Sequence, residues 1–296
     1  MNGRRFSTAL AMSLLAAVVA TAVCVTEVSA ATSSAPIAFG KDGDIWTVAA
    51  DGSGPRQLTS GGADDYGPAW SSDHGTIAFI RRPGRRVWLV NAAGGSVRRL
   101  TYTGPSLVTG STDLAYSPNG RLLAGSQVLS NGRYAITVLN LRTKTSRLIV
   151  RYFCEGGARS LTWSPNSRQL IATIEYGGGY GTLRIDVPGK RLIRTNYGGN
   201  MESASWRADG RYLLCSYWKV EEPHYPFWTF LMKPNGTKVK KLGEAQRFPD
   251  YSPDGSQYAF LRFNPNNDCD LLVANADGSG VTTIVEGVYF GGPAWK

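Results

Sequence analysis

An aromatic residue recurs six times along this chain at nearly constant intervals. Successive anchors lie 43 to 47 residues apart, close to the roughly 40–45 residues of a four-stranded propeller blade. Five of the anchors are followed by a turn and a second apolar segment, as in SLTWSPNSRQLIA at 160–172. The repeat therefore predicts six structural units. Their anchors are Trp70, Tyr116, Trp163, Trp206, Tyr251 and Trp295.

Each unit reads as four short strands. The anchor strand leads into a turn such as SPDG or SPNG, in which Pro presets the first central angle and Gly takes a positive φ. An apolar second strand follows, as at 258–262, and then a third strand, as at 44–50. A DGSG-type hairpin signal precedes the fourth strand. Because no segment has a sustained helical period, we predict an all-β, six-bladed β-propeller of four-stranded antiparallel blades.

The two ends of the repeat are complementary. Residues 36–59 contain the second, third and fourth strands of a unit without an anchor strand. The final residues, Pro293 to Lys296, contain an anchor strand and nothing after it. An open array would leave unpaired strand edges, which promote aggregation. We therefore predict that the C-terminal strand completes the first blade and closes the ring.

The first thirty residues have the pattern of a signal peptide. Arg4 and Arg5 precede an apolar run at 9–25, and VSA ends the segment, so cleavage is expected after Ala30. The run is short for a membrane span, which needs roughly 20 residues. We expect domains at 1–30 (signal peptide), 31–35 (linker) and 36–296 (propeller). The exported protein would lack a transmembrane segment and be secreted, periplasmic or cell-wall associated.

Charge and cysteine content narrow the partners. The net charge is +10, which suits an anionic cell-wall polymer or phospholipid surface but also an ordinary solvated surface. No block of Lys and Arg resembles a nucleic-acid arm, so no nucleic acid is expected. After cleavage three cysteines remain, an odd number without metal-ligand spacing, and Cys215 lies in an apolar run. We expect Cys215 to be buried, and we expect a monomer without metal or cofactor.

The candidate binding residues lie in the loops that join the fourth strand to the next anchor and the second strand to the third. These loops contain tyrosines and charges of both signs, whereas the turns of the opposite face contain no aromatic residue, so we expect only one face to be equipped for binding. Exposed Tyr with Arg and carboxylates suits a polar partner. The periodic anchors are interpreted as core residues. The candidates are Asp64, Asp65, Tyr66, Arg82, Tyr152, Glu155, Tyr180, Tyr197, His224 and Tyr289.

The repeat resembles the β-propeller of the TolB family. The similarity lies in PAW or LTWSPNS, the following IAF strand, the DIWTVAADGSG hairpin and RQLT. It covers residues 36–296 and is confined to the propeller, without the N-terminal domain of TolB proteins. The resemblance implies a periplasmic scaffold that binds other envelope proteins.

Two functions remain open on the sequence. The first is an exported, non-catalytic scaffold for a protein, a peptide or a cell-envelope saccharide. The second is a carbohydrate-active lyase or hydrolase on the same face, for which Asp64 or Asp65 with Glu155 could supply two carboxylates. The absence of a Gly-x-Ser-x-Gly motif argues against a serine peptidase. A convergent acid–base or His–metal cluster at the axis would favour the enzyme.

Overall fold

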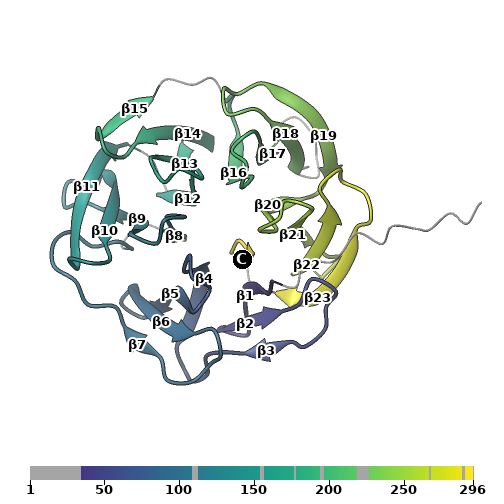
Figure 1. The fold of residues 1–296 in the computed structure, drawn as a ribbon, viewed down its shortest axis with the longest axis horizontal. Helices are drawn as coiled ribbons and strands as arrows, with labels where there is room; N and C mark the ends of the chain where they lie inside the picture. Colours follow the sequence, from purple (N-terminus) through teal and green to yellow (C-terminus); the bar gives the residue numbers. More distant parts are fainter. Residues whose placement is uncertain are drawn as a thin grey trace, which may run out of the picture. The chain divides into compact units, whose positions relative to one another are not determined.

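Six four-stranded antiparallel sheets make up the protein, as predicted. A computed structural model describes residues 35–108, 113–153, 157–176, 178–193, 197–218, 227–266, 268–288 and 291–295. Within these ranges there is no helix, and hence none that could cross a membrane. The sheets surround a central axis, with β4, β8, β12, β16 and β20 innermost and β3, β7, β11, β15, β19 and β23 outermost (Figure 1).

The first three blades cover the N-terminal half of the ring. Blade 1 consists of β24 (Ala294–Trp295), β1 (Ile37–Lys41), β2 (Asp44–Val48) and β3 (Arg56–Gln57). Blade 2 consists of β4 (Asp64–Trp70), β5 (Thr76–Arg82), β6 (Arg86–Asn91) and β7 (Arg98–Arg99). Blade 3 consists of β8 (Ala115–Tyr116), β9 (Leu122–Val128), β10 (Tyr134–Asn140) and β11 (Thr145–Tyr152).

The other three blades follow in chain order. Blade 4 consists of β12 (Ala158–Trp163), β13 (Gln169–Tyr176), β14 (Gly179–Asp186) and β15 (Arg191–Ile193). Blade 5 consists of β16 (Met201–Trp206), β17 (Leu213–Trp218), β18 (Phe227–Met232) and β19 (Lys238–Glu244). Blade 6 consists of β20 (Arg247–Tyr251), β21 (Gln257–Phe263), β22 (Cys269–Asn275) and β23 (Thr282–Val288).

The turn after each anchor is held by its own side chains. In blade 3, Ser117 Oγ donates to Asn119 Oδ1 at 2.8 Å and accepts from the N–H of Leu122 at 3.0 Å. Gly120 occupies φ 69° there, a conformation that costs glycine little. The same bonds join Ser164 with Asn166 and Ser252 with Asp254. The Ser-Pro-Asx sequence thus sets the connection between first and second strands.

The hydrophobic core is divided among the spaces between neighbouring sheets. One cluster joins residues of blades 3 and 4, and another joins blades 6 and 1. The anchors Trp70, Trp163, Tyr251 and Trp295 are buried, which confirms their interpretation as core residues, whereas Tyr116 and Trp206 are only partly buried. Burial of one such ring removes roughly 150–250 Å² from water. At about 25 cal/mol/Å² this contributes at most about 4–6 kcal/mol per anchor.

The last strand closes the ring, as the ends of the repeat predicted. Ile37 pairs with Trp295 and Ala38 with Ala294 in an antiparallel ladder. Trp295 Nε1 donates to the carbonyl of Ala35 at 2.8 Å. Trp70 Nε1, from blade 2, donates to the carbonyl of Ala294 at 3.1 Å. The two residues of β24 therefore bond to both blade 1 and blade 2.

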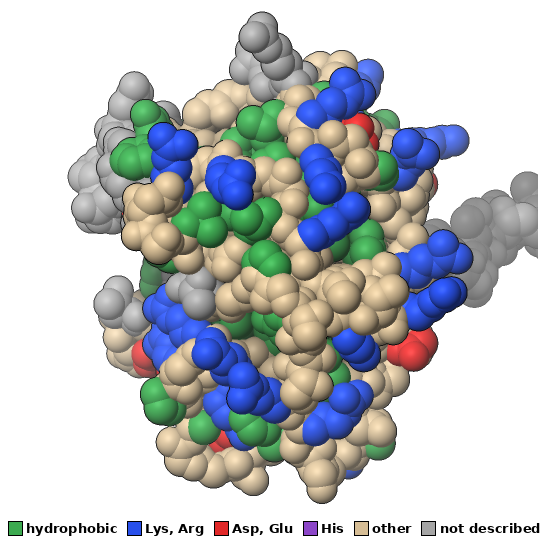
Figure 2. Space-filling model, turned by 90° about the vertical axis from the view of Figure 1, so that its left-hand side faces the viewer, with side chains coloured by type: hydrophobic (Ala, Val, Ile, Leu, Met, Phe, Trp, Pro, Cys, Tyr) green, Lys and Arg blue, Asp and Glu red, His purple; other side chains and the backbone are tan. Residues whose placement is uncertain are grey.

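The outer wall is basic on one side of the ring. Residues 81–194 contain 18 Lys or Arg and only 4 Asp or Glu. Because this excess is larger than the net charge of the whole chain, +10, the rest of the chain is net acidic. Figure 2 looks onto the side of the ring that carries blades 3 and 4, where blue Lys and Arg side chains far outnumber red Asp and Glu.

Ring closure can be tested at Trp295. Trp295→Ala should lower the free energy of unfolding by roughly 3–5 kcal/mol, because this indole is 1% exposed and its N–H is bonded. Trp206→Ala is the matched control and should lower the free energy of unfolding clearly less. Its indole is partly exposed, and the indole Nε1–H has no hydrogen-bond partner among the described residues. Removal of residues 293–296 should destabilise further and promote association. Urea unfolding followed by fluorescence measures the free energy of unfolding, and size-exclusion chromatography measures association. Equal losses of unfolding free energy in the two tryptophan variants would contradict the expectation.

Candidate functional site

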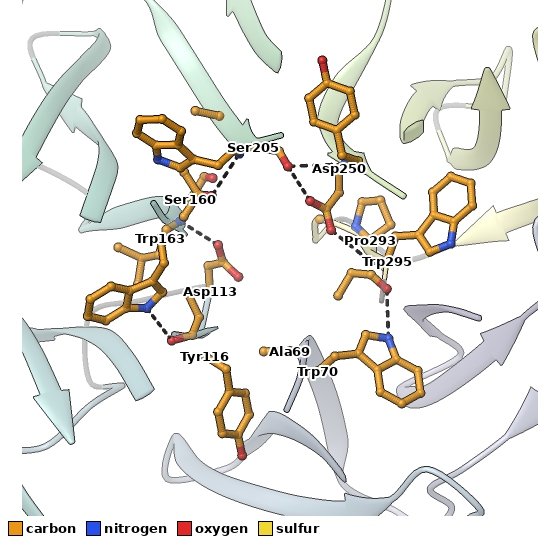
Figure 3. A pocket seen from close by; sticks show the side chains of 18 of the residues that line it. Ala69, Trp70, Asp113, Tyr116, Ser160, Trp163, Ser205, Asp250, Pro293 and Trp295 are labelled. Carbon is orange, nitrogen blue, oxygen red and sulfur yellow. Dashed lines mark hydrogen bonds between the residues drawn. The ribbon is translucent and has the colours of Figure 1, made fainter. Parts of the chain in front are cut away.

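The inner strands of all six blades enclose a cavity of about 390 Å³ on the ring axis. Its wall includes every aromatic anchor and the residues just before each of them. Figure 3 shows Asp113 and Asp250 on opposite sides of this cavity, with their carboxylates directed toward its centre. The cavity therefore combines aromatic walls with two inward carboxylates.

Both carboxylates bridge neighbouring blades. Asp113 Oδ2 accepts from the N–H of Leu161 in blade 4 at 2.8 Å, and Oδ1 accepts from the N–H of Leu114 at 2.9 Å. Asp250 Oδ2 accepts from the N–H of Trp295 at 2.9 Å. Asp250 Oδ1 accepts from the hydroxyl of Ser205 in blade 5 at 2.6 Å. Asp250 thus ties blades 5, 6 and 1 together at the axis.

A polar residue directly before the anchor repeats this link in three blades. Its side chain accepts the main-chain N–H of the next anchor along the ring. Such N–H groups belong to the free edges of the inner strands, and a buried N–H without a partner is costly. The acceptor and donor residues are Thr162 and Trp206 (3.3 Å), Ser205 and Tyr251 (3.3 Å), and Asp250 and Trp295 (2.9 Å).

The charge of Asp113 is set by its position in the ring. Burial raises the pKa of this carboxyl to about 7, although the N–H groups of Leu161 and Leu114 favour the ionised form. The negative charge of Asp250 raises the pKa of Asp113 further. Desolvation is the largest of these effects. Asp113 therefore changes charge near neutral pH while its neighbours hold it in place.

The cavity reaches the face that carries the turns between first and second strands. Pro118, Pro165, Ala208 and Pro253 of four such turns line it, together with His74. The turn-bearing face, which we expected not to be equipped for binding, therefore contributes residues to this cavity. The anchors Tyr116 and Trp206 are only partly buried, and both line the cavity.

The candidates of blade 2 form a compact group on the loop-rich face. Asp65 is 1% exposed and accepts from Arg81 Nε and Nη2 at 2.6 and 2.7 Å. This buried ion pair stabilises blade 2 and leaves Asp65 inaccessible to a partner. Asp64 and Arg82 form a half-exposed pair at 3.3 Å. The guanidinium of Arg82 lies 4.5 Å from the centre of the Tyr66 ring. Only Asp64 and Arg82 of this group offer polar atoms to a partner.

We expected the tyrosine candidates to be exposed, but three of them are not. Tyr66, Tyr152 and Tyr197 are all buried. The hydroxyls of Tyr152 and Ser126 lie 2.8 Å apart, and Tyr197 Oη donates to the carbonyl of Pro234 at 3.0 Å. Tyr152 and Tyr197 thus satisfy their hydroxyls within the protein, whereas the buried hydroxyl of Tyr66 has no hydrogen-bond partner among the described residues.

Tyr180 is half-buried, and its ring meets Trp218 edge to face at 6.0 Å. The remaining candidates, Glu155, His224 and Tyr289, lie outside the described residues. So does Cys154, whereas Cys215 is buried, as expected, and Cys269 is a buried free thiol. In the described part of the chain, no group of three or more His, Cys, Asp or Glu could hold a metal ion.

Sequence reasoning missed the two axial carboxylates. A signal was available for Asp250, because it directly precedes an anchor at a position where the other units have Ala, Ser or Thr. Asp113 is three residues before its anchor, where the other units have Gly, Ser or Phe. An acidic residue in the innermost strand is unusual because it loses hydration there. This contrast would have singled out both.

The sequence matches the family model described as the TolB beta propeller domain over residues 30–208. Two similar curated proteins are named Tol-Pal system protein TolB, from two strains of Anaeromyxobacter dehalogenans. The protein of strain 2CP-1 is 31% identical over 203 residues, which are 67% of this chain and 43% of that protein. That of strain 2CP-C is 35% identical over 85 residues, 28% of this chain and 18% of that protein. The matches thus span less than half of these relatives.

Solved structures show the same fold at lower identity. TolB from Acinetobacter baumannii superposes with a TM-score of 0.72 at 19% identity and covers 89% of this chain and 67% of its own. A putative TolB from Agrobacterium tumefaciens superposes with a TM-score of 0.67 at 18% identity, covering 87% and 90%. The family match over most of the ring, together with the six closed blades, shows that this chain belongs to the TolB β-propeller family.

Proposed function

We propose that this protein is an exported, non-catalytic scaffold that binds a protein partner of the cell envelope at its axial cavity. The observation that carries the proposal is the cavity of about 390 Å³ with Asp113 and Asp250 on opposite walls. Its aromatic and proline lining offers apolar surface, and its carboxylates offer acceptors. A partner that inserts a loop or chain end with a basic side chain would meet both.

Charge complementarity favours a basic insert. A cationic side chain between two carboxylates is stabilised more strongly in a partly desolvated cavity than in water. A charge-assisted contact of this kind is also directional, because both carboxylates are already fixed by main-chain N–H groups. The names of the curated relatives, proteins of the Tol-Pal system, support a protein partner over a saccharide.

The hydrolase alternative needs two carboxylates that act on a substrate, and Asp113 with Asp250 is the pair that converges. Both oxygens of Asp113 accept main-chain N–H groups, and both oxygens of Asp250 are bonded to neighbouring blades. A general acid has to release its proton to the substrate along an open hydrogen-bond path. The existing bonds use these groups to join blades, which supports the scaffold over the enzyme.

The partner site can be located by photo-crosslinking. A photoreactive side chain at Ala208, which is exposed at the cavity mouth, should give a discrete adduct with an envelope protein of the source cells. The same group at Val239, exposed on the outer strand β19, is the control and should not give that adduct. Asp113→Asn should weaken the adduct at Ala208. Adducts of equal yield at both positions, or turnover of a polysaccharide panel by the protein, would contradict the proposal.

The titration of Asp113 predicts a pH-dependent stability. Between the ordinary carboxyl value and about pH 7, Asp113 is protonated in the folded protein and ionised in the unfolded chain. The folded state therefore binds more protons, and stability falls as pH rises through this range. Asp113→Asn cannot ionise, so its free energy of unfolding relative to wild type should increase with pH and level off above about 7.

Urea unfolding at several pH values, followed by tryptophan fluorescence, measures this difference. Glu286→Gln, on the exposed surface of β23, is the control for loss of a carboxylate elsewhere. A difference between Asp113→Asn and wild type that stays constant from pH 5 to pH 8 would show that Asp113 does not titrate in this range.

A further inference from the structure

We propose that the loop-side ends of blades 3 and 4 form a surface that binds an anionic lipid bilayer. This surface, the arginine rim, consists of Arg133 and Arg151 with the apolar side chains of Val128, Phe153 and Tyr176. It is separate from the axial cavity and does not depend on the protein partner proposed above.

The sheet of blade 3 brings the first members of the rim together. Tyr134 of β10 pairs with Tyr152 of β11 on one side and with Val128 of β9 on the other. The rings of Tyr134 and Tyr152 stack at 6.0 Å and fix this end of the sheet. Arg133 directly precedes Tyr134, and Phe153 directly follows Tyr152. Arg133 and Phe153 therefore lie at the same end of the strands of blade 3.

Blade 4 extends the rim. Tyr176 ends its second strand, β13, and pairs with Gly179 at the start of β14, which is the position that Val128 occupies in blade 3. The two blades are neighbours, because Trp163 Nε1 donates to the carbonyl of Ala115 at 3.0 Å. Val128 and Tyr176 thus lie on the same face of adjacent sheets.

Three apolar side chains of the rim are exposed. Phe153 is 68% exposed, Tyr176 is 58% exposed and Val128 is 39% exposed. Aromatic side chains are favoured at the boundary between lipid headgroups and acyl chains, where the ring is buried and a polar atom stays in water. A soluble polyanion would recognise the arginines but would gain little from these apolar groups. The combination favours a bilayer.

The positive charge of the rim is not neutralised by its described neighbours. Arg133 and Arg151 are exposed, and none of the described acidic side chains forms an ion pair with them. Two described acidic residues of this face have their own partners, because Asp64 pairs with Arg82 and Glu175 pairs with Arg159 at 2.6 Å. Arginine suits phosphate because its planar fork donates two parallel hydrogen bonds.

The adjoining outer wall adds a long-range attraction. Further exposed cations lie on blades 2, 3 and 4, and Figure 2 shows many Lys and Arg side chains spread over this side of the ring. Each Lys or Arg close to an anionic leaflet strengthens binding, and this contribution falls off within the Debye length. The cations on the same face as the rim would help to bring the rim to the headgroups. Arg85 and Arg86, exposed where β5 connects to β6, lie on the same face as the rim, whereas Arg142, Lys144 and Arg191 lie at the opposite ends of their blades.

Vesicle co-sedimentation tests the rim with residues 31–296, which contain all six sheets and the compact unit at 32–296. The protein should bind vesicles of phosphatidylcholine mixed with phosphatidylglycerol and not phosphatidylcholine alone, and high salt should weaken the binding. Arg133→Glu with Arg151→Glu should weaken it roughly tenfold or more. The matched control, Arg211→Glu with Lys233→Glu, makes the same charge change at exposed positions of blade 5 and should weaken it much less.

The apolar part of the rim has its own control. Phe153→Ala should weaken vesicle binding several-fold at fixed salt, whereas Phe263→Ala, 46% exposed in blade 6, should leave it nearly unchanged. Equal losses for the two charge-reversal pairs would show a non-specific effect of net charge and overturn the proposal. So would binding to soluble polyphosphate that competes with vesicles while Phe153→Ala has no effect, or an absence of binding to anionic vesicles. Circular dichroism of each variant confirms the fold.

Discussion

The pairing of β24 with β1 is the contact on which the rest of this structure depends. Ala294 and Trp295 complete the sheet of blade 1, bury an indole, and receive hydrogen bonds from blades 1, 2 and 6 or donate to them. Without this strand, β1 would present an unpaired edge to the axial cavity. The ring, the cavity that it encloses and the orientation of the rim all follow from this closure.

At the axial cavity, main-chain N–H groups on the free edges of the inner strands find hydrogen-bond partners in neighbouring blades. Where the residue before an anchor is polar, its side chain accepts the N–H of the next anchor, as Ser205 and Asp250 do. Where that residue is alanine, an indole N–H can instead reach its carbonyl, as Trp163 does to Ala115. Polar side chains line part of the cavity because these main-chain groups need hydrogen-bond partners. Asp113 and Asp250 are two of the acceptors. The binding function proposed for the cavity thus uses groups that the fold already requires.

The sequence allowed the ring, its six blades and its closure to be predicted, because each depends on a pattern that repeats. The Ser-Pro-Asx turns bond within themselves, so local rules were sufficient for them. The pairing of Trp295 with β1 joins distant residues, and it followed from the incomplete repeats at the two ends of the sequence. The site was harder, because exposure of a loop side chain depends on contacts between blades. Tyr152 and Tyr197 have the composition of a binding face, yet their hydroxyls bond to Ser126 and Pro234 within the protein. Asp113 accepts from the N–H of Leu161, 48 positions later in the neighbouring blade, and no local pattern in the sequence indicates this contact.

Closure also decides how such a ring can change during evolution and folding. The bond from Trp295 to Ala35 spans 260 positions, so blade 1 stays incomplete until Ala294 and Trp295 have been synthesised. Contacts between such distant residues make folding slow, because the loop must be closed before they contribute. A linear solenoid can gain or lose a terminal repeat at the expense of one interface. In a circular array each blade has two interfaces, so the gain or loss of one blade requires the ring to close again around a different number of blades.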